Sequence, residues 1–174
     1  MIQDIKSYFF TKRLEADSSK HKAKLELLEF KDAKKIGIAY DASDYSTITK
    51  VRDLEMRLKK EGKNVNIFAY INSNDKKFEP FLFTRKDLNW FGYPKKQQLF
   101  DFANIEFDML LGIFKDTDSP LNAIFAKSKS KLRVGVNYSQ SPRLYDLIIG
   151  TKKVSKTGDI LEILVNFLTS IRTK

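Results

Sequence analysis

Short apolar runs bounded by turn residues recur along the chain from residue 34 onward. Runs of this length are typical of strands that are buried on both faces of a parallel sheet. A less clear run near residues 79–84 predicts a further strand. The clear runs predict strands at residues 34–40, 64–72, 107–114, 132–137 and 145–151.

Amphipathic stretches separate these runs. Apolar residues from Ile48 to Leu58 recur at three- and four-residue spacing, and Gly62 is placed to end that helix. Residues 119–128 predict a short helix, and an amphipathic pattern from Thr157 predicts a closing helix. Alternating strands and helices indicate an α/β, Rossmann-like doubly wound fold with a mainly parallel sheet of five to six strands.

The predicted domains are an N-terminal helical arm, residues 1–33, and a single α/β domain, residues 34–174. In the arm, Ile2, Ile5 and Phe9 fall at helical spacing and form an apolar stripe. We expect this stripe to pack on a protein partner, on a second copy of the chain or back on the sheet, and the pattern does not distinguish these three alternatives. The path of residues 73–106 is not predicted beyond a turn at 92–94 and a short helix near 95–103.

The amino-acid composition excludes several kinds of functional site. A chain of 174 residues is long enough for one core. It has no cysteine and one histidine, which excludes disulfides, thiolate zinc sites and cysteine nucleophiles, so we expect neither a metal nor a cofactor. No apolar run approaches the roughly 18 residues of a membrane span. We therefore expect a cytoplasmic protein without a membrane span.

The net charge of +10 favours an anionic partner. Residues 115–156 hold nine Lys and Arg against three acids, so the excess is concentrated there. The stretch KSKSKLRVGVN, residues 127–137, places cations at alternate positions before a predicted strand. The candidate nucleic-acid-binding cations of this region are Lys127, Lys129, Lys131 and Arg133, with Arg143, Lys152, Lys153 and Lys156 after later strands. A solvated basic face explains the same pattern.

A second candidate surface is the segment FLFTRKDLNWFGYPKKQ, residues 81–97, which interleaves aromatic rings with cations. Rings beside cations can stack bases while the cations hold phosphates. Rings that cover the end of the core are the alternative. The candidate residues in this segment are Arg85, Lys86, Trp90 and Tyr93.

Catalytic motifs are sparse. The seven glycines are too far apart for a dinucleotide-binding or P-loop motif, and those at 37, 112, 135 and 150 lie in predicted strands, where close packing explains them. His21 lies in the polar middle of the arm, away from any strand end. Asp44 and Asp118 are placed to cap helices, although with Asp41 and Asp116 they could also form a Mg²⁺ cluster.

The stretches FDMLLGIF (107–114), KSKLRVG (129–135) and YDLIIG (145–150) resemble an uncharacterised small bacterial α/β family, a domain of unknown function typical of Bacteroidota. That resemblance implies no established activity. IGIAYDASDYS (36–46) and the strands after it are also similar in place to the N-terminal half of heptosyltransferase-type glycosyltransferases. This second likeness implies a catalytic acid at Asp44, although Ser43 stands where a glycine is usual.

The function we predict is a non-enzymatic, basic α/β binding protein for an anionic partner, RNA or a ribonucleoprotein. One alternative is an enzyme or enzyme remnant of glycosyltransferase-like architecture that acts on a phosphate-bearing substrate. The other is an adaptor that docks on a protein partner through residues 1–30.

Overall fold

The computed structural model describes residues 2–19, 29–72, 82–95, 97–115, 118–136, 144–150 and 157–170. Its strands are β1 (Lys35–Asp41), β2 (Asn64–Ile71), β3 (Leu82–Thr84), β4 (Met109–Ile113), β5 (Leu132–Val136) and β6 (Leu147–Ile149). The α-helices are α1 (Ile2–Ser18), α2 (Tyr45–Lys60), α3 (Leu121–Lys127) and α4 (Thr157–Ser170). Two short 3-10 helices, η1 (Arg85–Asp87) and η2 (Gln97–Phe100), follow β3.

The six strands form one sheet in the order β3-β2-β1-β4-β5-β6, and all five pairings between them are parallel. The strand order reverses between β1 and β4, so the carboxyl ends of these strands mark the switch point of a doubly wound sheet. The predicted Rossmann-like α/β fold is confirmed.

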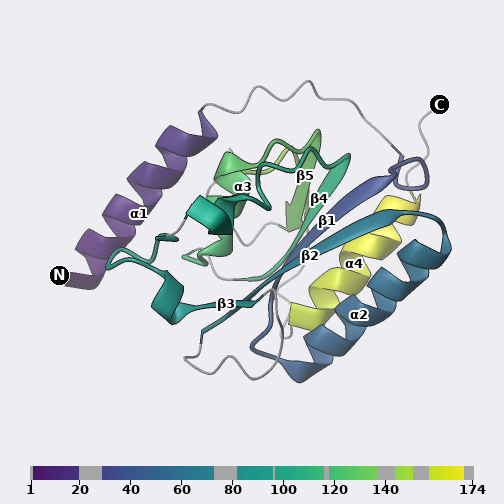
Figure 1. Ribbon diagram of the computed structural model, residues 1–174, viewed down its shortest axis with the longest axis horizontal. Helices are drawn as coiled ribbons and strands as arrows, with labels where there is room; N and C mark the ends of the chain where they lie inside the picture. Colours follow the sequence, from purple (N-terminus) through teal and green to yellow (C-terminus); the bar gives the residue numbers. More distant parts are fainter. Residues whose placement is uncertain are drawn as a thin grey trace.

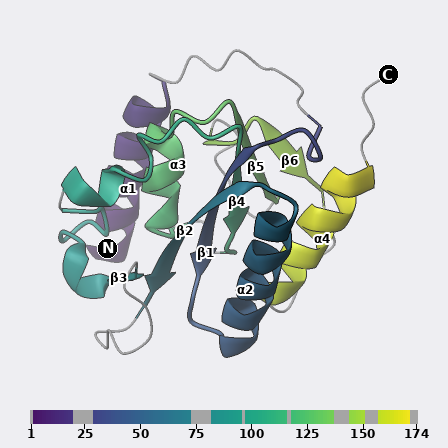
Figure 2. The same cartoon turned by 45° about the vertical axis from the view of Figure 1, so that its right-hand side comes forward.

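Helices cover both faces of the sheet (Figure 1), and α2 and α4 lie side by side on one of them (Figure 2). Val51 and Leu58 from α2 and Leu164 from α4 are buried against that face. Asp44 caps α2 by accepting a hydrogen bond from the Ser46 backbone N–H, as predicted. Gly62 ends the helix with a φ of 79°, which a side chain would rarely adopt.

The opposite face is packed by aromatic rings, because glycines in the strands leave room for them. A Cβ atom added to three of these glycines would lie under 3 Å from a ring atom. The distances are 2.8 Å from Gly37 to Phe107, 2.9 Å from Gly112 to Phe125 and 2.3 Å from Gly135 to Tyr145. Close packing was also expected at Gly150, but that expectation is wrong, because nothing lies within 4 Å of the same position there.

Helix α1 packs against α3 on the aromatic face. Phe10 and Leu14 are buried, whereas Ile5 and Phe9 are 44% and 50% exposed. The prediction that Ile5 and Phe9 pack back on the sheet is therefore wrong. That the stripe packs on a protein partner or on a second copy of the chain stays a prediction. The side chain of Ile2 lies outside the described residues.

Residues 82–95 and 97–107 lie beside α3 and α1 (Figure 1). The strand expected near 79–84 is β3, of which residues 82–84 are described, and η2 lies within the helix expected near 95–103. Between them, Leu88 pairs with Pro94 in an isolated antiparallel bridge, and Gly92 turns the chain with a φ of 84°. We call residues 88–94 the bridge loop.

Candidate functional site

The segment KSKSK alternates because serines face inward and lysines face outward. Ser128 and Ser130 are buried and share a hydrogen bond of 2.6 Å between their hydroxyl oxygens. Lys129 is exposed, and Lys131 forms an ion pair of 2.8 Å with Asp108. Partial burial raises the pKa of Asp108, but hydrogen bonds from Lys131 and from two backbone N–H groups outweigh it and lower that pKa. The segment is thus a helix end that leads into β5.

Arg133 is a correction to the predicted set. Its side chain is only 4% exposed, and its guanidinium donates to both carboxylate oxygens of Asp146, at 2.9 and 3.0 Å. A third N–H group of the guanidinium donates a hydrogen bond to the backbone carbonyl of Phe125. A polyanion cannot reach this group, so Arg133 stabilises the junction of α3, β5 and β6 instead.

The other predicted basic group, Arg143, Lys152, Lys153 and Lys156, lies outside the described residues. The same holds for His21 and Asp116. These predictions stay predictions.

In the segment 81–97, the bridge loop carries one buried ring and one exposed ring, Tyr93 and Trp90. The Asn89 side-chain oxygen accepts hydrogen bonds from the backbone N–H groups of Phe91 and Tyr93, which fixes the loop. Trp90 is 58% exposed, whereas Tyr93 is 6% exposed and its hydroxyl donates to buried Asp17 of α1. Tyr93 is therefore a second correction, because its ring is part of the wall and is not free to stack on a base.

Exposed rings from α1 and the bridge loop form a continuous row. Phe9 lies 5.7 Å from Tyr8 and 5.1 Å from Phe91, and Phe91 lies 5.0 Å from Trp90, measured between ring centroids. We call Tyr8, Phe9, Phe91 and Trp90 the ring row. Large exposed rings gathered in one place on a protein mark interaction surfaces more often than scattered ones do.

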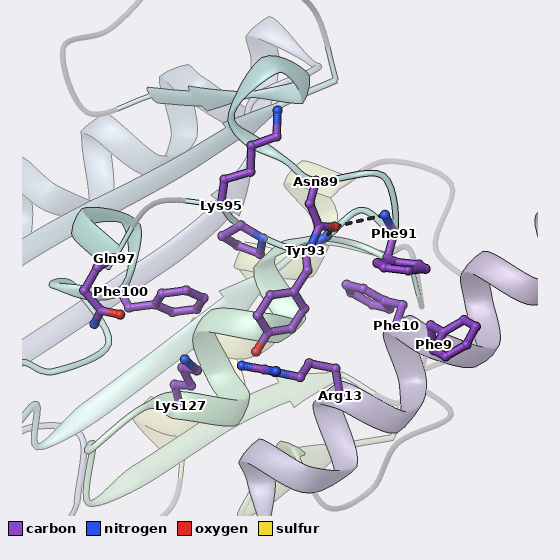
Figure 3. Close-up of a pocket in the computed structure, with 11 residues that line it drawn as sticks. Phe9, Phe10, Arg13, Asn89, Phe91, Tyr93, Lys95, Gln97, Phe100 and Lys127 are labelled. Carbon is purple, nitrogen blue, oxygen red and sulfur yellow. Dashed lines mark hydrogen bonds between the residues drawn. The ribbon is translucent and has the colours of Figure 1, made fainter.

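A groove of about 560 Å³ lies between α1, the bridge loop and α3 (Figure 3). We call it the aromatic groove. None of its eleven lining residues is acidic. Its exposed or half-buried rings are Phe9 and Phe91, its floor includes Phe100 and Tyr93, and its cations are Arg13, Lys95 and Lys127.

Two of the three cations of the aromatic groove lie beside rings, whereas the Lys95 ammonium donates a hydrogen bond of 3.1 Å to the Lys86 carbonyl. The Arg13 guanidinium lies 5.4 Å from the Tyr93 ring centroid and 3.5 Å from an Asp17 oxygen. Lys127 lies 4.0 Å from the Phe100 centroid. Figure 3 shows the Tyr93 hydroxyl directed toward Arg13. Two or more positive charges are thus fixed beside aromatic faces, the combination that binds a planar anion.

Sequence patterns did not predict that the arm contributes to this groove. Lys127 was predicted, and Lys95 lies inside the predicted segment 81–97, but Phe9 and Arg13 come from the arm. Their spacing of four residues places them on one side of a helix. That spacing could have marked a mixed aromatic and cationic face, although only the tertiary fold sets it beside the bridge loop.

Of the other candidates, Arg85 and Trp90 line a second pocket, described below, while Lys86 is exposed and lines neither pocket. Asp44 uses both carboxylate oxygens on Ser46 and Thr47, in keeping with the capping role. The cap predicted for Asp118 is wrong, because α3 begins after Pro120. Among the residues that the structure describes, no group of three acidic or histidine side chains could hold a metal.

No helix in the described ranges is both long and apolar enough to cross a bilayer. No curated protein matches the chain. The chain belongs to a family of unknown function, DUF6913, whose model matches residues 6–171. The match covers α1 as well as the sheet, so the helix that forms one wall of the aromatic groove is part of the family domain.

Proposed function

We propose that this protein binds single-stranded RNA, alone or within a ribonucleoprotein, in the aromatic groove, and that it catalyses no reaction. The observation that carries the proposal is that one groove combines the exposed Phe9 ring and the half-buried Phe91 ring with three cations and has no acid in its lining. Stacking on an aromatic side chain contributes about 1–3 kcal/mol per base. Arg13 and Lys127, whose charges lie beside the groove rings, supply the charge that phosphates require.

The geometry favours unpaired bases. A ring can stack on a base only where the base is not already stacked inside a duplex, and single-stranded segments are the usual target of RNA-binding proteins. The ring row extends the groove over the outer surface of α1 and the bridge loop, with Lys6 4.9 Å from the Trp90 centroid and Lys12 5.9 Å from that of Tyr8. A strand that leaves the groove would thus meet more rings and more positive charge.

Fluorescence anisotropy with a labelled single-stranded RNA, measured at several salt concentrations, tests the proposal. The variant Arg13→Gln/Lys127→Gln should weaken binding about tenfold or more, because two charge-assisted phosphate contacts are lost. The slope of log K against log salt should fall by roughly 0.7 per lost contact, the value for single strands. A duplex RNA of the same sequence should bind less tightly than the single strand, because its bases are already stacked.

The matched control is Lys59→Gln/Lys60→Gln at the end of α2, which removes the same charge on the opposite face of the sheet. It should leave affinity nearly unchanged. Equal losses in the two variants would mean that only the net charge of the protein attracts RNA. Absence of binding by the native protein at low salt would contradict the proposal outright.

A further inference from the structure

A second pocket lies at the carboxyl ends of the strands, next to the switch point. Asn72 directly follows β2, Arg85 directly follows β3, and Asp118 lies in the connection between β4 and α3. Open α/β sheets bind ligands at this edge, because loops from neighbouring strands converge there. Its volume is about 490 Å³, within the range of small-molecule sites, roughly 300–1,000 Å³. We call it the carboxyl-edge pocket.

The lining combines three kinds of contact. Trp90 offers an exposed indole, and Arg85 offers an exposed guanidinium. Lys6 also lines the pocket, and its ammonium lies over the indole at 4.9 Å from the ring centroid, so a second positive charge covers one face of the ring and the other face is the one on which a base can stack. Asp118 supplies an exposed carboxylate, which accepts hydrogen bonds. A matching ligand carries a planar ring, an anionic group and a hydrogen-bond donor.

The β1–α2 connection, which is not part of the pocket lining, lacks the turn that binds a pyrophosphate in related folds. Pyrophosphate sites in doubly wound folds use a glycine-rich turn after the first strand. Here that turn is Ala42-Ser43-Asp44, without glycine, and Asp44 is used as a helix cap. A guanidinium binds one phosphate group well without such a turn, because its planar fork matches the oxygens of the anion.

We infer that the carboxyl-edge pocket binds a nucleoside monophosphate. The base stacks on Trp90, the phosphate contacts Arg85 and Lys6, and an exocyclic amino group of the base donates to Asp118. This pocket is distinct from the aromatic groove, although Phe10, Asn89 and Phe91 line both, and Trp90 and Lys6 also lie on the surface over which an RNA strand would leave the groove.

Trp90 is the only tryptophan of the chain, so tryptophan fluorescence reports on ligands that reach this indole. Titration with AMP, CMP, GMP and UMP, excited at the red edge of tryptophan absorption, should give saturable quenching. Adenosine and inorganic phosphate should each bind at least about tenfold more weakly than AMP, because each makes only part of the contacts. UMP, whose base has no exocyclic amino group, should bind more weakly than CMP, and Asp118→Ala should remove that preference.

Arg85→Gln should weaken AMP binding about tenfold or more. The control is Lys86→Gln, which removes the neighbouring cation that does not line the pocket. Equal effects of the two variants, or no saturable quenching by any monophosphate, would overturn the inference.

The groove variant Arg13→Gln/Lys127→Gln separates this inference from the proposed function. It should keep AMP affinity while it loses RNA affinity. Loss of AMP binding in that variant would place the nucleotide in the aromatic groove and overturn the inference. Failure of the native protein to bind RNA would leave the AMP titration as an independent result.

Discussion

At the scale of single residues, the contact between Arg133 and Asp146 joins three elements. Besides the two guanidinium donors, the Arg133 backbone N–H donates to the Asp146 carboxylate at 2.8 Å, and the Asp146 backbone N–H donates to the Arg133 carbonyl at 2.9 Å. The two side chains are 4% and 7% exposed. A buried charge of this kind is tolerated only while its partner is present.

Asp146→Ala should lower the free energy of unfolding by about 3–5 kcal/mol, because it leaves the Arg133 charge buried without its carboxylate. Urea denaturation measures the change. Asp53→Ala, which removes an exposed acid from α2, should stay within about 0.5 kcal/mol of the native protein. A loss below about 1 kcal/mol for Asp146→Ala would show that water or another group satisfies the arginine.

Gly135 gives a second residue-scale prediction. Gly135→Ala should destabilise the protein by about 1–3 kcal/mol, because the new Cβ would fall 2.3 Å from the buried Tyr145 ring. Thermal and urea unfolding measure it. Gly150→Ala is the matched control and should be nearly neutral, since nothing lies within 4 Å. Equal stability of the two variants would mean that the Tyr145 ring moves aside at little cost.

The roles of some charged residues can be predicted from the sequence and those of others cannot, because burial depends on contacts that are distant in sequence. Lys127 and Arg133 are alike in a charge pattern, yet one lines a groove and the other is enclosed by Asp146, which stands thirteen residues later. Capping by Asp44 was predictable, because it depends only on residues within the next turn. When the partner of a side chain is distant in sequence, no pattern in the neighbouring residues predicts the contact.

At the scale of elements, α1 is fixed to the body by apolar packing and by a buried hydrogen bond to the bridge loop. Phe10 and Leu14 pack with the aromatic face, and buried Asp17 accepts a hydrogen bond from the Tyr93 hydroxyl. Burial raises the pKa of the Tyr93 hydroxyl, and the hydrogen bond to Asp17 raises it further. The bond that fixes α1 to the bridge loop therefore requires a protonated tyrosine.

The pH dependence of stability follows from that raised pKa. The folded protein holds the Tyr93 proton more tightly than the unfolded chain, whose tyrosines titrate near pH 10. This contribution is fully present below about pH 10 and is lost as the pH rises further. Urea unfolding between about pH 9 and 11.5 should show a smaller alkaline loss for Tyr93→Phe than for the native protein. The same alkaline loss in both would contradict the assignment.

The apolar stripe of α1 shows why a helix is easier to predict than the face it buries. Ile5 and Phe9 have the spacing of a packed face, and so do Phe10 and Leu14. Which pair is buried depends on α3 and the bridge loop, more than 70 residues away along the chain. Of the exposed pair, Phe9 lines the aromatic groove.

At the scale of the whole molecule, the strand pattern was sufficient for the fold class and insufficient for the path of residues 73–106. Runs such as 107–114 are apolar enough to be buried on both faces, which a parallel sheet requires. Short elements such as β3 and η1 have little pattern of their own, and their neighbours determine them. Both candidate sites use this short-element region, so the least predictable part of the fold is also the part with most of the candidate chemistry.

The two outermost strands, β3 and β6, have three residues each, whereas β1 and β2 in the middle have seven and eight. An unpaired strand edge is a template for addition of a strand from another chain, and its length sets how many hydrogen bonds such an addition gains. Within the described residues, each outermost strand offers an incoming strand an edge of three residues, so an addition there gains few hydrogen bonds. The shortness of β3 and β6 thus limits edge-to-edge aggregation through these two strands.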